Sequence, residues 1–138
     1  MKRYPTEQFF QAFKDEASKW IQRFGLVSWE VNFVLLGDDE CQNETEKDGA
    51  ALCSTMSLNR SCDIILRKTW GIAPTEYLIR RSAYHEVFEL LLSRLGHLAF
   101  HPKASEDDWE EEIHVVIRTM ENVFWAPEGE KYRTESDR

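Results

Sequence analysis

The spacing of apolar residues changes along this chain of 138 residues, and the changes indicate which segments become helices and which become strands. Within residues 6–24, apolar side chains recur every three or four positions, which is the period of a helix with one buried face. Within residues 28–36 they mostly alternate with polar side chains, which is the period of a strand. The apolar positions of the helical segment are Phe9, Phe10, Phe13, Ala17, Trp20, Ile21 and Phe24. A chain with both periods buries its apolar faces by stacking helices on a sheet.

The middle of the chain predicts a hairpin. Residues 50–59 and 62–68 both have the composition of strands, and a short turn centred on Arg60 separates them. Residues 37–49, which precede the hairpin, are acidic and poor in apolar side chains, as is typical of a loop. Together with the earlier strand, the hairpin is expected to form a three-stranded, mainly antiparallel sheet.

Two further helices are predicted after the hairpin. A long helix over about residues 74–99 opens with Pro-Thr, a pair that favours a helix start. Ser105 or Asp107 can cap a last helix over residues 108–125. The order of one helix, three strands and two helices predicts a small domain of the α+β class.

Length and composition limit the kind of protein this can be. The length suits a single domain, expected over residues 1–125, with a polar and flexible tail over residues 126–138. The net charge of −8 disfavours nucleic acid as a partner. There is no apolar run of the roughly 18–20 residues that cross a bilayer, and the N-terminal residues lack the apolar region of a signal peptide. The three cysteines show no C-x-x-C pair, which fits reduced thiols in a cytoplasmic protein.

The segment SAYHEVFELLL, residues 82–92, contains the main candidate site. Residues four apart on a helix lie about 40° from each other, so His85 and Glu89 share a face. Apolar neighbours lead us to expect that this face points inward, where a divalent cation would offset the cost of burying a carboxylate beside an imidazole. The alternative is an ordinary amphipathic helix in which His85 is solvated or hydrogen-bonded, because this pattern also arises by chance.

A catalytic zinc site needs a third protein ligand besides His85 and Glu89. The last helix offers His114, at the edge of the apolar stripe of that helix, and His114 completes the predicted set of ligands for Zn²⁺. Glu110 lies closer to the centre of the same stripe and is the rival for this position. Two further candidates, which are more typical of helix ends, are His97 and His101.

Three stretches of the chain resemble the small zincin-like domains, a group that includes the SprT-like proteins and the very small metallopeptidases encoded by phages and prophages. These stretches are WIQRFGLVSWEVNFVLL at 20–36, RRSAYHEVFELLL at 80–92 and EEIHVVIRTMENVFW at 111–125. The resemblance implies one zincin-like domain in which His85 binds zinc and Glu86 is the general base. The chain departs from the family pattern at Glu89, which stands in the place of the second histidine of His-Glu-x-x-His.

The resemblance implies a zinc-dependent metallopeptidase in the cytoplasm, or in the host cytoplasm if a phage encodes the chain. Glu86 would take a proton from the attacking water, and a peptide substrate would lie extended along an edge strand, either 50–59 or 62–68. The alternative is a catalytically inactive zincin-like module that binds and sequesters a host or regulatory protein. Both hypotheses predict a protein or peptide as the partner.

Overall fold

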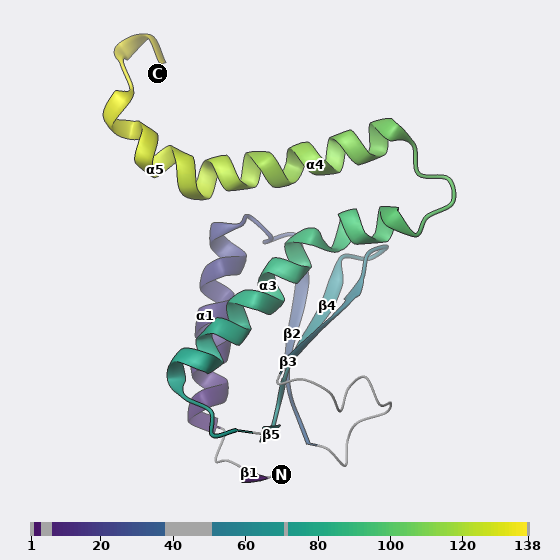
Figure 1. Ribbon diagram of the computed structural model, residues 1–138, viewed down its shortest axis with the longest axis vertical. Coiled ribbons are helices and arrows are strands. Elements are labelled where there is room, and N and C mark those ends of the chain that lie inside the picture. The colour runs from purple at the N-terminus through teal and green to yellow at the C-terminus, as the bar shows by residue number, and fades with distance from the viewer. Residues whose placement is uncertain (1, 4–6, 38–50, 71, 138) are drawn as a thin grey trace.

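The structure, a computed structural model, describes residues 2–3, 7–37, 51–70 and 72–137 (Figure 1). The main elements are helix α1 (Glu7–Arg23), strands β2 (Glu30–Leu36), β3 (Ala51–Met56) and β4 (Ser61–Arg67), and helices α3 (Glu76–Ala99) and α4 (Glu106–Met120). The short elements are strands β1 (Lys2–Arg3) and β5 (Thr69–Trp70), the π-helical turn η2 (Glu121–Trp125), helix α5 (Ala126–Gly129) and the 3₁₀ turns η3 (Glu130–Tyr132) and η4 (Glu135–Asp137). The predicted α+β class is confirmed. Most of the predicted acidic loop 37–49, with Cys41, lies outside the described residues.

The three main strands form one sheet in the order β2-β4-β3. Strand β4 pairs antiparallel with β3 but parallel with β2, so the sheet is mixed rather than mainly antiparallel, and the expectation is corrected on this point. Strands β3 and β4 are antiparallel because a tight turn joins them. The apolar alternation of β2 is compatible with either strand direction, so the sequence does not determine how β2 pairs. The central place of β4 agrees with its sequence, since the consecutive residues Ile64, Ile65 and Leu66 are all buried.

Helices α1 and α3 lie side by side on one face of the sheet, and the core fills the space between the two layers (Figure 1). Burying a large apolar side chain contributes roughly 1.5–3 kcal/mol to stability. The largest fully buried side chains are Phe13 of α1, Ile64 and Leu66 of β4, and Ile79, Val87 and Leu90 of α3. The expectation that helices stack their apolar faces on a sheet is therefore confirmed, with α1 and α3 as the two helices.

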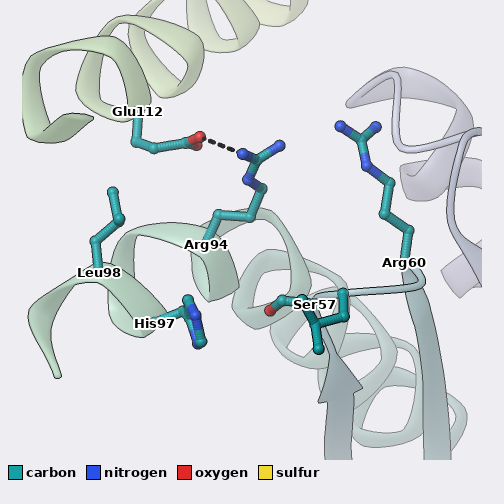
Figure 2. A pocket seen from close by; sticks show the side chains of 7 residues that line it. Ser57, Arg60, Arg94, His97, Leu98 and Glu112 are labelled. Atoms are coloured by element: carbon teal, nitrogen blue, oxygen red, sulfur yellow. Dashed lines mark ion pairs between the residues drawn. The ribbon is translucent and has the colours of Figure 1, made fainter. Parts of the chain in front are cut away.

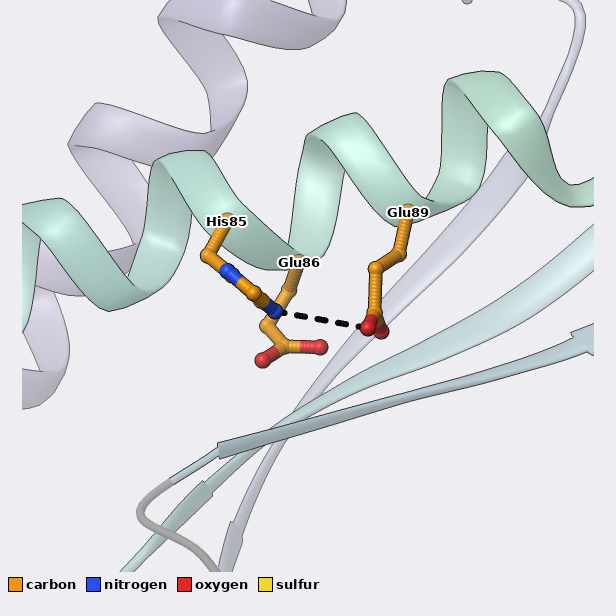
Figure 3. A group of neighbouring side chains, drawn as sticks. All are labelled: His85, Glu86 and Glu89. Carbon is orange, nitrogen blue, oxygen red and sulfur yellow. Dashed lines mark ion pairs between the residues drawn. The ribbon is translucent and has the colours of Figure 1, made fainter.

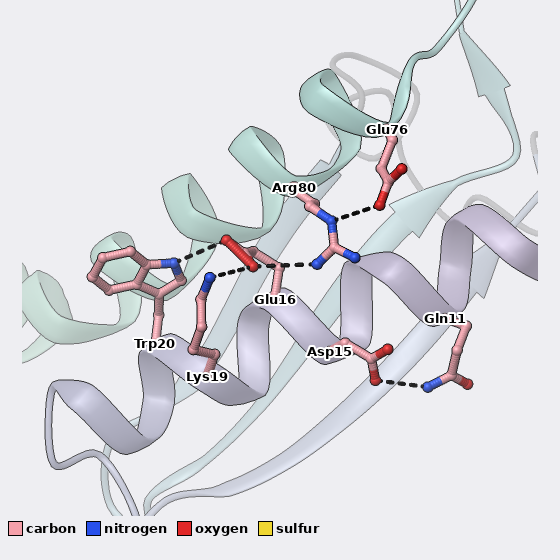
Figure 4. Close-up of polar contacts among 7 residues, drawn as sticks. All are labelled: Gln11, Asp15, Glu16, Lys19, Trp20, Glu76 and Arg80. Atoms are coloured by element: carbon pink, nitrogen blue, oxygen red, sulfur yellow. Dashed lines mark hydrogen bonds and ion pairs between the residues drawn. The ribbon is translucent and has the colours of Figure 1, made fainter.

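A polar group joins α1 to the N-terminal half of α3 at the rim of the core (Figure 4). Glu16 accepts a hydrogen bond from Trp20 Nε1 at 3.3 Å, and its carboxylate also contacts Lys19 Nζ at 2.7 Å and Arg80 Nη1 at 3.3 Å. Arg80 donates in addition to Glu76 at 3.0 Å. Burial opposes the ionisation of Glu16, but the hydrogen bonds from Lys19 and Trp20 and the charge of Arg80 lower its pKa below the ordinary value. The Glu16 carboxylate thus adds an ion pair with Arg80 to the apolar contact between α1 and α3.

Helix α4 runs back past the C-terminal half of α3 (Figure 1). Ser105 caps it, because the Ser105 hydroxyl accepts from the Asp108 N–H and the Asp108 carboxylate accepts from the Ser105 N–H. Arg94 of α3 pairs with Glu112 of α4 at 3.1 Å. No residue of α4 is fully buried, so this helix packs against the rest of the protein with only part of its apolar side covered. Among the described helices, none is both long and apolar enough to cross a bilayer.

Candidate metal site

Helix α3 buries a different arc from the one that the sequence predicted. Its buried positions are Ile79, Ala83, Glu86, Val87, Leu90 and Leu91. The side chains of His85 and Glu89, which were expected to point inward, are 67% and 55% exposed. Glu86 is instead the buried member, with 6% exposure. The helix is apolar on more than one side, and its contacts with both α1 and the sheet decide which arc faces the core.

His85, Glu86 and Glu89 nevertheless form one group, with side chains that point from α3 toward the strands (Figure 3). His85 Nε2 lies 3.3 Å from Glu89 Oε1. One potential ligand atom from each of the three residues lies within 4.8 Å of the others. Donors bound to one zinc ion at about 2.0–2.2 Å lie roughly 3–4 Å apart. Small rotations of the exposed His85 and Glu89 side chains would therefore bring the three donors around one cation.

The environment of Glu86 favours a positive ligand. Its Oε2 is buried and has no hydrogen-bond partner. Burial, together with the charge of Glu89 and a hydrogen bond shared with it, raises the pKa of Glu86 to about 8. A buried carboxylate with an unsatisfied oxygen is costly unless a proton or a cation neutralises it. The observed residues thus fit a divalent cation, since two carboxylates and one imidazole are donors that such ions accept.

Cys53 of β3 lies close to this group, which the sequence did not predict. The sheet register places Cys53 opposite Ile64 and Thr55 opposite Cys62, so the two cysteines are diagonal neighbours on the face that meets the helices. Both thiols are free. A hydrogen bond with Cys62, burial, and the charges of Glu86 and Glu89 raise the pKa of Cys53. Cys53 is therefore a neutral thiol beside the carboxylates, and only the packing of α3 on β3 makes them neighbours.

His114 is not part of this group. It is exposed on α4, and its Nδ1 lies 2.7 Å from the backbone carbonyl oxygen of Glu110, to which it can donate. His97 and His101 lie near the end of α3 with ring centroids 5.8 Å apart. Within the part of the chain that the structure describes, the residues grouped so that they could hold a metal are His85, Glu86 and Glu89, and none comes from α4. The geometry thus brings Glu86, rather than His114, to the other two predicted ligands.

Comparison of the chain with protein-family models, with curated proteins and with solved structures gave no match. The zincin-like resemblance accordingly stays a prediction from the sequence. The chemistry of the candidate site rests on the three side chains and on the environment of Glu86.

Proposed function

We propose that this protein binds one divalent metal ion, zinc, through His85, Glu86 and Glu89. The observation that carries the proposal is the buried Glu86 carboxylate, whose Oε2 lacks a hydrogen-bond partner and which has a ligand atom within 4.8 Å of those of His85 and Glu89. A cation offsets the repulsion between the two carboxylates and satisfies the buried oxygen. One imidazole and two carboxylates leave coordination positions open, as catalytic sites require.

The arrangement supports hydrolysis of a peptide as the reaction. A zinc ion held by these residues would lower the pKa of a bound water and polarise a carbonyl group. Each glutamate keeps a second carboxylate oxygen that can accept a proton from the attacking water. Strand β3 is an edge of the sheet, and no strand among the described residues pairs with its outer side. An extended peptide can add to that edge through backbone hydrogen bonds, close to the three donors on α3.

Metal binding is tested on protein purified without chelators, by elemental analysis and by calorimetric titration with zinc and, separately, manganese. The wild type should bind one zinc ion per chain. His85→Ala and Glu89→Gln should lose it, because each removes a ligand or its charge. Glu111→Gln is the matched control, since Glu111 is exposed on α4 and away from the site. A folded wild type that takes up neither metal at micromolar concentration would refute the proposal.

Glu86→Gln decides the role of the buried carboxylate. If Glu86 is a ligand, the variant loses zinc together with any hydrolysis. If Glu86 is only the general base, as the family resemblance implies, the variant keeps zinc and loses hydrolysis alone. Hydrolysis is measured on a pool of blocked peptides, with chelator-treated protein as the blank. Zinc binding without cleavage of any peptide would identify a binding module instead of an enzyme.

A further inference from the structure

An apolar hollow of about 520 Å³ opens between the end of β3 and the C-terminal half of α3. The residues that line it include Met56, Ser57, Leu58, Ser93, Gly96 and Phe100. Three of these are large apolar side chains that face solvent, with exposures of 64% for Met56, 104% for Leu58 and 91% for Phe100. A side chain at Gly96 would meet nothing within 4 Å, so the hollow has open space above the helix backbone. Exposed apolar side chains gathered around a concave surface are typical of a binding site.

The hollow lies further along α3 and β3 than the candidate metal site. From Glu89 to Gly96 the helix advances seven residues, or roughly 10 Å. From Cys53, beside the carboxylates, to Ser57, at the hollow, β3 and its turn advance roughly 13 Å. An extended peptide covers that distance in three or four residues. The outer edge of β3 runs along the same path, and it offers backbone groups to a strand that would pass both places.

The neighbouring charges are already engaged. A smaller hollow of about 290 Å³ next to the first is lined by Ser57, Arg60, Arg94 and Glu112 among others (Figure 2). Arg94 pairs with Glu112 at 3.1 Å, and Arg60 Nη1 donates to Ser28 Oγ at 2.9 Å. These two guanidinium groups therefore have partners within the protein. The larger hollow offers mainly apolar contact to a ligand, and its polar lining residues are Thr55, Ser57, Ser93 and His97.

We propose that this hollow receives a large apolar side chain, such as leucine or phenylalanine, of an extended peptide bound along the outer edge of β3. This apolar residue of the peptide lies three or four positions from the peptide bond at the metal site, and its fit to the hollow determines which peptides bind. The substrate class is thus an extended segment with a large apolar residue at a set distance from the reacting bond. This inference rests on the proposed function for the reaction, but the binding step can be measured without metal.

The test fills the hollow and measures binding of a defined probe. The probe is a blocked seven-residue peptide of alternating serine and threonine with one central leucine, and the comparison peptide carries alanine there. Binding to ¹⁵N-labelled protein is followed by amide chemical shifts, with and without zinc. Gly96→Leu places a side chain in open space and removes a helix-weakening glycine, so the fold should be retained. Arg81→Leu is the matched control, because it adds the same side chain at an exposed position of α3 outside the hollow.

The leucine probe should shift the amides of Met56, Leu58 and Gly96, and the alanine peptide should bind about tenfold more weakly. Gly96→Leu should weaken binding of the leucine probe to a similar extent, whereas Arg81→Leu should bind it as the wild type does. Equal binding of the two peptides, or unchanged binding by Gly96→Leu, would overturn the proposal. Concentration-dependent shifts of the same amides without peptide would also overturn it, since a second copy would then fill the hollow. Absence of zinc binding would refute the proposed metal site, but it would not change what the peptide-binding results say about the hollow.

Discussion

The charge of Glu86 should make the stability of the metal-free protein depend strongly on pH. Burial and the neighbouring Glu89 raise the Glu86 pKa from 4.5 to about 8. The unfolded chain loses the proton near pH 4.5, whereas the folded protein keeps it up to about pH 8. The folded state therefore binds one proton more than the unfolded state between these values, and stability falls as pH rises. The contribution of the protonated group is complete below pH 4.5 and is lost by about pH 8.

The size of the effect follows from the same pKa shift. The interval from 4.5 to about 8 corresponds to at most about 5 kcal/mol in the free energy of unfolding. For a chain of this length, that is a change in melting temperature on the order of 15 °C. Glu86→Gln has nearly the same shape as the protonated acid but cannot ionise. The variant should match the wild type at pH 5 and should exceed it in stability at pH 8 by up to about 5 kcal/mol.

Urea denaturation in the presence of chelator, at pH 5, 6.5 and 8, measures this difference. Glu111→Gln, an exposed glutamate on α4, should follow the wild type at every pH. Zinc in place of chelator should reduce the difference at pH 8, because zinc at a hundredfold excess over its Kd adds about 3 kcal/mol to the wild type, which binds it only when folded. If the difference in free energy of unfolding between wild type and Glu86→Gln stays constant within about 1 kcal/mol from pH 5 to pH 8, the inference that the buried Glu86 keeps its proton is refuted.

His114→Ala should keep the zinc content and melting temperature of the wild type, because His114 is exposed on α4 outside the three-residue group; loss of zinc in elemental analysis would restore it as a ligand. Phe13→Ala should lower the free energy of unfolding by about 3–5 kcal/mol in urea titrations, because its side chain is fully buried between α1 and the sheet. A loss below about 1 kcal/mol would contradict that packing. Ser105→Ala should destabilise the protein by about 1 kcal/mol through loss of the α4 cap, whereas Asp107→Ala should have a smaller effect in the same titration.

Much of the fold could be predicted because helix and strand formation depends on local spacing. The predicted helix over 6–24 corresponds to Glu7–Arg23, and the strand predicted over 62–68 corresponds to Ser61–Arg67. Helix α3 begins at the expected Pro-Thr pair, with Thr75 as its cap, and Ser105, one of the two expected candidates, caps α4; an N-cap needs only its own side chain and an N–H three residues on. The proximity of His85 and Glu89 was predictable for the same reason, since residues four apart on a helix are neighbours whatever surrounds them.

The direction of β2, the burial of α3 and the position of α4 could not be predicted in this way. An alternating strand presents the same apolar face whether it runs parallel or antiparallel to its neighbour, and only the assembled sheet sets β2 parallel to β4. Helix α3 is apolar around more than one arc, and its packing against both α1 and the sheet buries Glu86 while leaving His85 and Glu89 exposed. Helix spacing thus puts three donors together, but long-range packing gives Glu86 its unsatisfied oxygen and keeps His114 apart from the group. The motif is local, whereas the desolvation that makes it a candidate site comes from residues distant in the chain.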